Sequence, residues 1–186
     1  MENYLVRDLM VPLSEYATVP EGSSLLEAVL ALEVAQEEYD HTKYKHRAVL
    51  ILNSKSEVVG KLSHLDILLA LEPQAVETKE YDQLQQFHFS FQFIQDLKRQ
   101  KRMETLPLKD LCGKAAQLKV ENFMTYPTEN ERISGKAQLD LAVNQLVIGK
   151  HLSLLVTEND KVVGILRLTD VFAWVFHMMK ECSLPA

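Results

Sequence analysis

An internal repeat constrains this chain more than any other feature of its sequence. The stretch VVGKLSHLDILLAL (Val58–Leu71) is written again as VVGILRLTDVFAWV (Val162–Val175), with five of the fourteen positions identical. The glycine and the aspartate of each copy lie 104 residues apart, and several other positions exchange one apolar residue for another. Two copies of one pattern predict two similar structural units that bury their apolar faces together.

The repeat extends upstream with a different spacing. The segment VRDLM (Val6–Met10) matches VENFM (Val120–Met124), and LLEAVLAL matches QLDLAVNQL, both at a spacing of 114 residues. The first copy therefore carries about ten extra residues, which we place in the polar stretch VAQEEYDHTKYKHR. These residues would lengthen a helix or enlarge the loop after it.

Each copy predicts the same order of elements. An extended piece (YATV or ERIS) leads to a helix with apolar residues at i, i+3, i+4 and i+7, over Ser24 to about Gln36 and Gln138 to about Ile148. Two apolar runs rich in branched residues, RAVLILN and LSLLVTE, form hairpins with EVVGKL and KVVGIL. A second helix begins just after Leu62 or Leu166. The predicted fold class is α+β, with a strand–helix–strand–strand–helix unit twice.

The segment between the copies, residues 72–118, predicts a helical linker. Its motif FHFSFQF alternates like a strand, but a helix gathers the apolar residues on two faces, as expected for a helix packed between two partners. The basic run KRQKR then lies near the C-terminus of that helix, where cations are favourable; alternatively it is a small patch for phosphate or a partner. One face holds Leu84, Phe87, Phe91 and Ile94, the other Phe89, Phe93 and Leu97, and the basic run spans Lys98–Arg102.

Composition and charge narrow the class of protein. With 47% apolar and 25% charged residues, the chain is typical of a folded globular protein. The net charge of −6 argues against a broad nucleic-acid surface, and no apolar run reaches the ~20 residues of a membrane span. Cys112 and Cys182 form no CxxC pair, and the six histidines show no metal-binding spacing. We therefore expect a cytoplasmic protein without metal, membrane or nucleic-acid partner.

The motif GKLSHLD carries the most chemistry. Ser63 stands where a helix N-cap is expected, and Asp66 takes the third helical position. A helix N-terminus at a cleft suits a phosphate, and the Asp66 carboxylate could accept two hydrogen bonds from a vicinal diol such as that of ribose. S-x-x-D is equally an ordinary capping box that serves only the helix. The second copy keeps the acid as Asp170 but replaces the cap by Arg167.

These pieces resemble a known family. The segments VRDLM, TVPEGSSLLEAV, RAVLILN and VVGKLSHLDIL look like a CBS domain, and the second set looks like its tandem partner. Together they resemble a stand-alone CBS pair, or Bateman module. The resemblance implies two β-α-β-β-α units about a pseudo-two-fold axis, with two clefts that commonly hold adenosine-containing ligands. We divide the chain accordingly into CBS domain 1 (1–71), the linker (72–118) and CBS domain 2 (119–182).

The family motif, Gly-h-x-Thr/Ser-x-x-Asp, can be carried over residue by residue. In that family the Asp holds the ribose and the Thr or Ser holds the phosphate. Gly60, Ser63 and Asp66 match it fully, whereas in the second copy Arg167 stands at the hydroxyl position before Asp170. Arg167 could grip a di- or triphosphate, or it could fill the cleft by pairing with Asp170 or another carboxylate.

The resemblance also implies contacts to the base from the first strand and the start of the second strand of each copy. Each cleft would combine the Asp of one copy with base contacts from the other. The expected contacts are Ala17, Thr18, Val19, His46, Arg47 and Ala48 in the first copy, and Arg132, Ile133, His151 and Leu152 in the second.

The function implied is a regulatory, nucleotide-sensing module and not an enzyme. Its expected ligand is an adenine nucleotide (AMP, ADP or ATP) in one or both clefts, with no required cofactor. It would act as a homodimer or through an effector protein that the sequence does not identify. The alternative is a CBS scaffold whose clefts are closed by side chains. No nucleophile with a base, P-loop or dinucleotide motif is present in the sequence.

Overall fold

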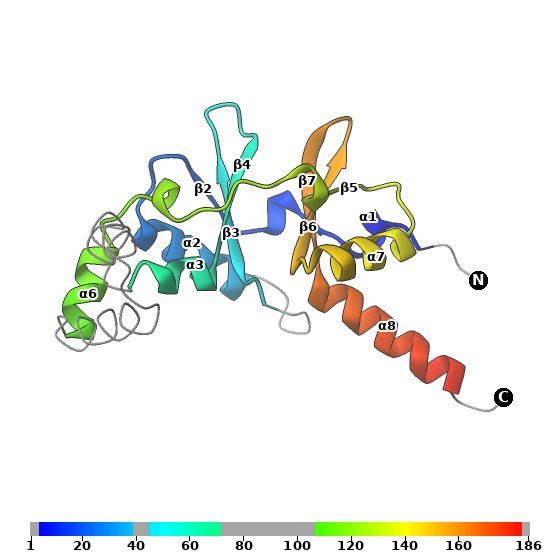
Figure 1. Cartoon of the computed structure of the whole chain (residues 1–186). Coiled ribbons are helices and arrows are strands. Elements are labelled where there is room, and N and C mark those ends of the chain that lie inside the picture. Colours follow the sequence, from blue (N-terminus) through cyan, green and yellow to red (C-terminus); the bar gives the residue numbers. More distant parts are fainter. Residues whose placement is uncertain (1–3, 39–44, 72–106, 184–186) are drawn as a thin grey trace, which may run out of the picture.

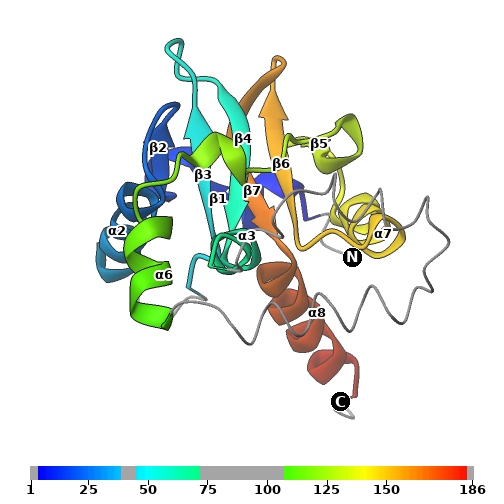
Figure 2. The same ribbon diagram turned by 60° about the vertical axis from the view of Figure 1, so that its left-hand side comes forward.

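The computed structural model describes residues 4–38, 45–71 and 107–183. The helix expected over Leu84–Leu97 and the basic run Lys98–Arg102 lie outside the described residues. Two small sheets stand side by side, and the turns of their two long hairpins lie at the same end of the molecule (Figure 1). The major helices lie towards the other end (Figure 2). This is the mixed α+β fold that the repeat predicts.

The first repeat forms a three-stranded sheet. Its strands β2 (Thr18–Pro20), β3 (Ala48–Leu52) and β4 (Val58–Ser63) lie in that order. Helix α2 (Leu25–Glu38) makes the crossover between the parallel pair β2 and β3, while β3 and β4 form an antiparallel hairpin that leads into helix α3 (His64–Leu69). The predicted order of elements is confirmed.

The second repeat has the same order. Strand β5 (Arg132–Ser134) is parallel to β6 (Ser153–Glu158), and α7 (Leu139–Gly149) connects them. Strand β7 (Lys161–Arg167) returns antiparallel to β6 and leads into α8 (Leu168–Ser183), which extends away from the body (Figure 1). Helix α2 has 14 residues and α7 has 11, so part of the surplus of the first copy lengthens its helix.

The segment that leads into each repeat packs on the other repeat. Helix α1 (Val6–Leu9) and strand β1 (Val11–Pro12) precede the first repeat, yet β1 pairs with β7, which gives the second sheet the order β1-β7-β6-β5. The segment before the second repeat returns the contact, since Thr125 pairs with Lys61 in β4. Val11 with Ile165 and Thr125 with Lys61 are the same contact made twice, shifted by the two spacings of the repeat. The pseudo-two-fold relation is thus visible in the pairing itself.

Three apolar clusters follow from this exchange. The core of the first repeat takes in Val120 and Met124 from the segment before the second repeat. The core of the second repeat takes in Val6. A third cluster joins the two sheets and contains Val11, Tyr16, Leu50, Val58, Leu155 and Ile165.

The described end of the linker also packs on the first repeat. Helix α6 (Leu108–Ala115) is followed by backbone carbonyls of Ala116 and Leu118 that accept hydrogen bonds from Leu26 and Leu25. These bonds satisfy the otherwise unpaired N–H groups in the first turn of α2. Three short 3-10 turns complete the described chain: Leu13–Glu15 (η1), Val120–Asn122 (η2) and Glu129–Glu131 (η3).

The glycine of each repeat lies where the exchanged segment crosses, which makes a paired prediction possible. A Cβ on Gly164 would stand 2.5 Å from the carbonyl oxygen of Val11, whereas a Cβ on Gly60 would meet mainly the side chain of Met124. Backbone in a sheet cannot move aside, but a methionine side chain can. We expect Gly164→Ala to lower the free energy of unfolding by about 1–3 kcal/mol and Gly60→Ala by less. Urea unfolding measures both, and an equal loss for the two variants would contradict the assignment.

Candidate functional site

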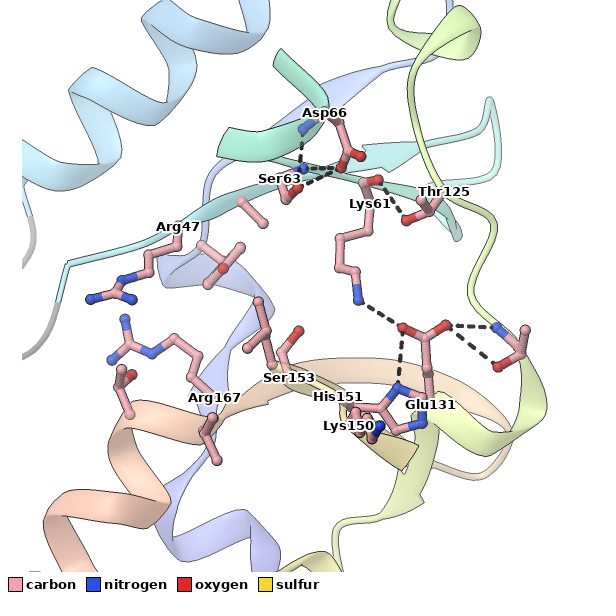
Figure 3. Close-up of a pocket in the computed structure, with 16 residues that line it drawn as sticks. Arg47, Lys61, Ser63, Asp66, Thr125, Glu131, Lys150, His151, Ser153 and Arg167 are labelled. Atoms are coloured by element: carbon pink, nitrogen blue, oxygen red, sulfur yellow. Dashed lines mark hydrogen bonds and ion pairs between the residues drawn. The ribbon is translucent and has the colours of Figure 1, made fainter. Parts of the chain in front are cut away.

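A pocket of about 500 Å³ lies between the two repeats (Figure 3). This volume is within the range of small-molecule sites. Its walls come from the start and end of both hairpins, from the first turns of α3 and α8, and from the segment that leads into β5. The lining residues are Tyr16, Arg47, Ala48, Lys61, Ser63, Asp66, Thr125, Thr128, Glu131, Lys150, His151, Leu152, Ser153, Arg167, Leu168 and Thr169.

Ser63 and Asp66 line the pocket and also cap α3. The Ser63 hydroxyl donates to Oδ2 of Asp66 at 2.6 Å and accepts from the Asp66 backbone N–H at 3.3 Å. The Ser63 backbone N–H donates to the same carboxylate oxygen at 2.7 Å. The capping box is therefore present. Both side chains nevertheless border the pocket, so the capping role and a ligand role coincide in space.

A polar bridge between Lys61 and Glu131 crosses the pocket. Lys61 of β4 donates to Oε1 of Glu131 at 2.8 Å, and each of the two side chains is 16% exposed. Nδ1 of His151 lies 4.0 Å from the same oxygen, and the Thr128 backbone N–H donates to Oε2 at 3.1 Å. Burial opposes ionisation of Glu131, but the hydrogen bonds from Lys61 and Thr128 lower the pKa of this carboxyl below its usual value. The bridge ties the first repeat to the second.

Sequence reasoning missed Lys61 and Glu131. One signal was available for Lys61, because it lies two residues before Ser63 on the same strand and so shares its face. Glu131 gave no comparable signal, since its partner is 70 residues away.

The second motif is arranged differently. Nε and Nη2 of Arg167 donate to the two carboxylate oxygens of Asp170 at 2.6 and 2.7 Å, and Arg167 is only 5% exposed. The structure thus shows one of the two roles predicted for Arg167, the pairing with Asp170, and contact with a phosphate stays a prediction. Nη1 lies 3.4 Å from Nδ1 of the buried His46, and the ring of His46 packs edge-on against Tyr16 at 4.4 Å. We call Tyr16, His46, Arg167 and Asp170 the Arg167 cluster.

The Arg167 cluster shifts the ionisation of its members. Burial, and then the positive charge of Arg167, lower the pKa of His46 to about 4. Burial also raises the pKa of Tyr16 to about 12, although Arg167 and the backbone of Arg47 and Ala48 act in the opposite direction. At neutral pH both rings are therefore uncharged. The Arg167–Asp170 ion pair is thus packed against two neutral rings.

The structure brings together some of the predicted site residues but not others. Ser63, Asp66, Arg47, Ala48, His151, Leu152 and Arg167 line the pocket. His46 and Asp170 belong to the Arg167 cluster behind it. Thr18 and Arg132 lie in β2 and β5 and do not line the described pocket, while three others are buried in the repeat cores, namely Ala17, Val19 and Ile133. Contact of these residues with a base stays a prediction.

The pocket lining carries more positive than negative charge. Four cationic side chains (Arg47, Lys61, Lys150 and Arg167) stand against the two carboxylates of Asp66 and Glu131. Lys61 and Arg167 are paired with carboxylates. Arg47 and Lys150 have no carboxylate partner within the described part of the chain. A pocket with this balance favours an anionic ligand.

Comparison with known sequences decides the family. The family model described as "CBS domain" matches residues 6–73. Residues 6–73 are a CBS domain. The matched residues contain the Gly60, Ser63 and Asp66 motif, and the second repeat reproduces the same elements in the same order. No curated protein matches the sequence.

Solved structures share the fold along nearly the whole chain. CBSX2, solved in complex with AMP, has a TM-score of 0.60 and 19% sequence identity, with 94% of this chain and 98% of CBSX2 covered. A CBS domain-containing protein of unknown function from Bacillus anthracis gives 0.59 and 16%, covering 94% of each chain. ATU1752 from Agrobacterium tumefaciens gives 0.56 and 18%, covering 91% of each. At these identities the likeness establishes the fold: a CBS pair.

The described residues show no sign of two other kinds of site. They hold no group of three or more His, Cys, Asp or Glu side chains placed to bind a metal ion. None of the described helices has both the length and the apolar character needed to cross a membrane.

The lowered pKa of His46 predicts that the stability of the protein depends on pH. Because its folded pKa of about 4 lies below the ordinary value of 6.5, the folded state favours the neutral ring. Its contribution is therefore complete above pH 6.5 and is lost as the pH falls from 6.5 towards 4. We expect the melting temperature to fall between pH 6.5 and 5, where ordinary carboxylates remain ionised. His46→Gln should flatten this part of the profile, and an unchanged slope in that variant would contradict the assignment.

Proposed function

We propose that this CBS pair is a regulatory module that binds an adenosine nucleotide (AMP, ADP or ATP) in the pocket bordered by Ser63 and Asp66. One observation carries the proposal: Ser63 and Asp66 of the fully matched motif line a pocket of about 500 Å³ whose lining is net positive. The carboxylate of Asp66 suits the ribose hydroxyls, and both of its described hydrogen bonds within the capping box use Oδ2. The complex of the structurally similar CBSX2 with AMP supports the same class of ligand.

We propose one nucleotide site and not two. The Arg167 cluster occupies the space that the second motif would offer, because Arg167 spans both oxygens of Asp170 and His46 is fully buried beside it. A second ligand would have to break this ion pair inside the protein, which costs several kcal/mol. The adenosine would instead contact His151 and Leu152 of the second repeat, since the family resemblance implies that each cleft combines the Asp of one copy with base contacts from the other.

The module is proposed to act through association and not through catalysis. Helices α3 and α8 carry large exposed apolar side chains, among them Leu65 (74% exposed), Leu68 (58%) and Phe172 (62%). We propose that these helices contact a second copy or an effector protein in the cytoplasm. We also propose the division into CBS domain 1 (1–71), linker (72–118) and CBS domain 2 (119–182), counting each exchanged leading segment with the repeat that it precedes.

A scaffold without a ligand is the alternative, and the capping box favours it. Ser63 and Asp66 hydrogen-bond to one another in the described structure, so the capping box alone explains their positions. The two functions differ in what happens when Asp66 is removed.

Thermal unfolding with and without ADP distinguishes the nucleotide-binding module from the scaffold, and the protein itself offers a matched control. Ser24 and Glu27 form a second capping box, with the Ser24 backbone N–H donating to Glu27 at 2.6 Å, and neither residue lines the pocket. At a hundred times the dissociation constant, ADP should stabilise the wild type by about 2.7 kcal/mol. Asp66→Ala should abolish that gain, whereas Glu27→Ala should lose a similar cap, about 1 kcal/mol, and keep it. No gain for the wild type with AMP, ADP or ATP would support the scaffold.

A charged substitution on α8 tests whether this helix mediates a dimer. Phe172→Glu on α8 should convert a dimer to a monomer in sedimentation equilibrium, because it places a charge in a surface that must be desolvated. Leu141→Glu on α7, which replaces a leucine that is 55% exposed, is the control and should leave the dimer intact. A wild type that stays monomeric at high concentration would leave only an effector protein for this surface.

A further inference from the structure

We propose that the end of the pocket walled by Arg47 and Arg167 binds the outer phosphates of a nucleoside di- or triphosphate, so that ADP or ATP is preferred to AMP. This inference rests on the proposed function and names the ligand class of the same site.

Arg47 is held on the pocket wall through its backbone. Its carbonyl oxygen accepts a hydrogen bond from the His64 N–H at 3.3 Å, at the start of α3. The carbonyl of the preceding His46 accepts from Nε2 of Gln36 at 3.1 Å, and the Tyr16 hydroxyl interacts with the Arg47 backbone. The guanidinium is therefore offered to the pocket from a fixed base. No carboxylate in the described ranges pairs with it.

Arg167 faces Arg47 from the second repeat. Figure 3 shows the two guanidinium groups pointing towards each other across one end of the pocket. Asp170 holds two of the nitrogens of Arg167, so that this side chain cannot swing away from Arg47 without losing a buried ion pair. Two like charges placed this way repel, and an anion between them converts the repulsion into attraction. Guanidinium groups suit phosphate because they bind it with two parallel hydrogen bonds.

The position of Ser63 gives the ligand a direction. Ser63 pairs with Ala48, the neighbour of Arg47, and Arg167 pairs with Ser153 on the facing hairpin. Figure 3 shows Ser63 between the two arginines on one side and Lys61 on the other, so a phosphate next to Ser63 lies where a phosphate chain can extend towards the arginines. The outer phosphates of the same nucleotide would extend between Arg47 and Arg167.

The opposite end disfavours phosphate. Glu131 lies there with a pKa held below its usual value, and it already occupies Lys61 at 2.8 Å. A phosphate chain directed that way would meet this carboxylate and would have to displace it from Lys61. The charges of the pocket thus orient the ligand, with its base near His151 and Leu152 and its phosphates near the arginines.

Isothermal titration with AMP, ADP, ATP and inorganic tripolyphosphate tests the inference. The wild type should bind ADP and ATP at least about tenfold more tightly than AMP, the effect of one good charge-assisted bond. Arg47→Gln should lose that preference and keep the affinity for AMP. Lys150→Gln is the matched control, because it removes another pocket cation without a described carboxylate partner and should keep the preference. Arg47 is exposed, so both variants should fold, as circular dichroism will verify.

The outcomes distinguish the two proposals. Equal affinities of the wild type for AMP, ADP and ATP, or an Arg47→Gln variant that weakens AMP as much as ADP, would overturn the ligand class and leave the nucleotide module standing. Binding of tripolyphosphate that depends on Arg47, without binding of any nucleotide, would retain the phosphate site and overturn the proposed function. No binding of any of the four probes would overturn both.

Discussion

The structure depends on the exchange of the two leading segments. Strand β1 crosses from the first repeat to pair with β7, and the segment around Thr125 crosses back to pair with β4. The crossing needs close approach of backbone to backbone, which Gly164 permits against Val11. Each repeat therefore completes its apolar core with residues of the other, Val120 in one case and Val6 in the other. Neither repeat has a whole core by itself, and their hairpin ends are brought face to face.

The two ends of the resulting pocket are unequal because the repeats differ at a few facing positions. Lys61 in the first repeat is equivalent to Ile165 in the second, and Ser63 is equivalent to Arg167, because each pair holds the same place in the two sheets. Lys61 of the first repeat therefore forms a polar bridge with Glu131 of the second at the pocket wall, and each of the two side chains is 16% exposed. The second repeat supplies Arg167, which is 5% exposed and is paired with Asp170. Similar backbones thus give a polar bridge at one end of the pocket and a buried ion pair at the other.

Much of the fold could be predicted from the sequence, because the signals are local or repeated. The apolar periodicity gave the helices, the hairpin turns gave the strands, and the S-x-x-D motif gave the cap at Ser63. The exchange could not be read in this way, since Val11 and Ile165 carry no local sign of their pairing. Spacing suggested the Arg167–Asp170 pair, three residues apart, as one of two roles for Arg167, and the structure shows that pair with Arg167 only 5% exposed.

The site was predicted less completely for the same reason. Alternation along a short strand sends every second side chain into the core. Val19 and Ile133, expected to contact a base, are therefore buried with the apolar residues of their own repeats. Glu131 could not be found because it acts through Lys61, a residue of the other repeat. A pocket formed between two repeats is determined by such long-range pairs, which a single sequence does not display.

A crystal structure of the protein grown with ADP tests the central claim most directly. We predict one ADP per chain, with its ribose at Asp66, its base beside His151 and its phosphates towards Arg47 and Arg167, and with the Arg167–Asp170 pair unbroken. ADP bound in place of the Arg167–Asp170 ion pair, or an empty pocket at saturating ADP, would contradict the account.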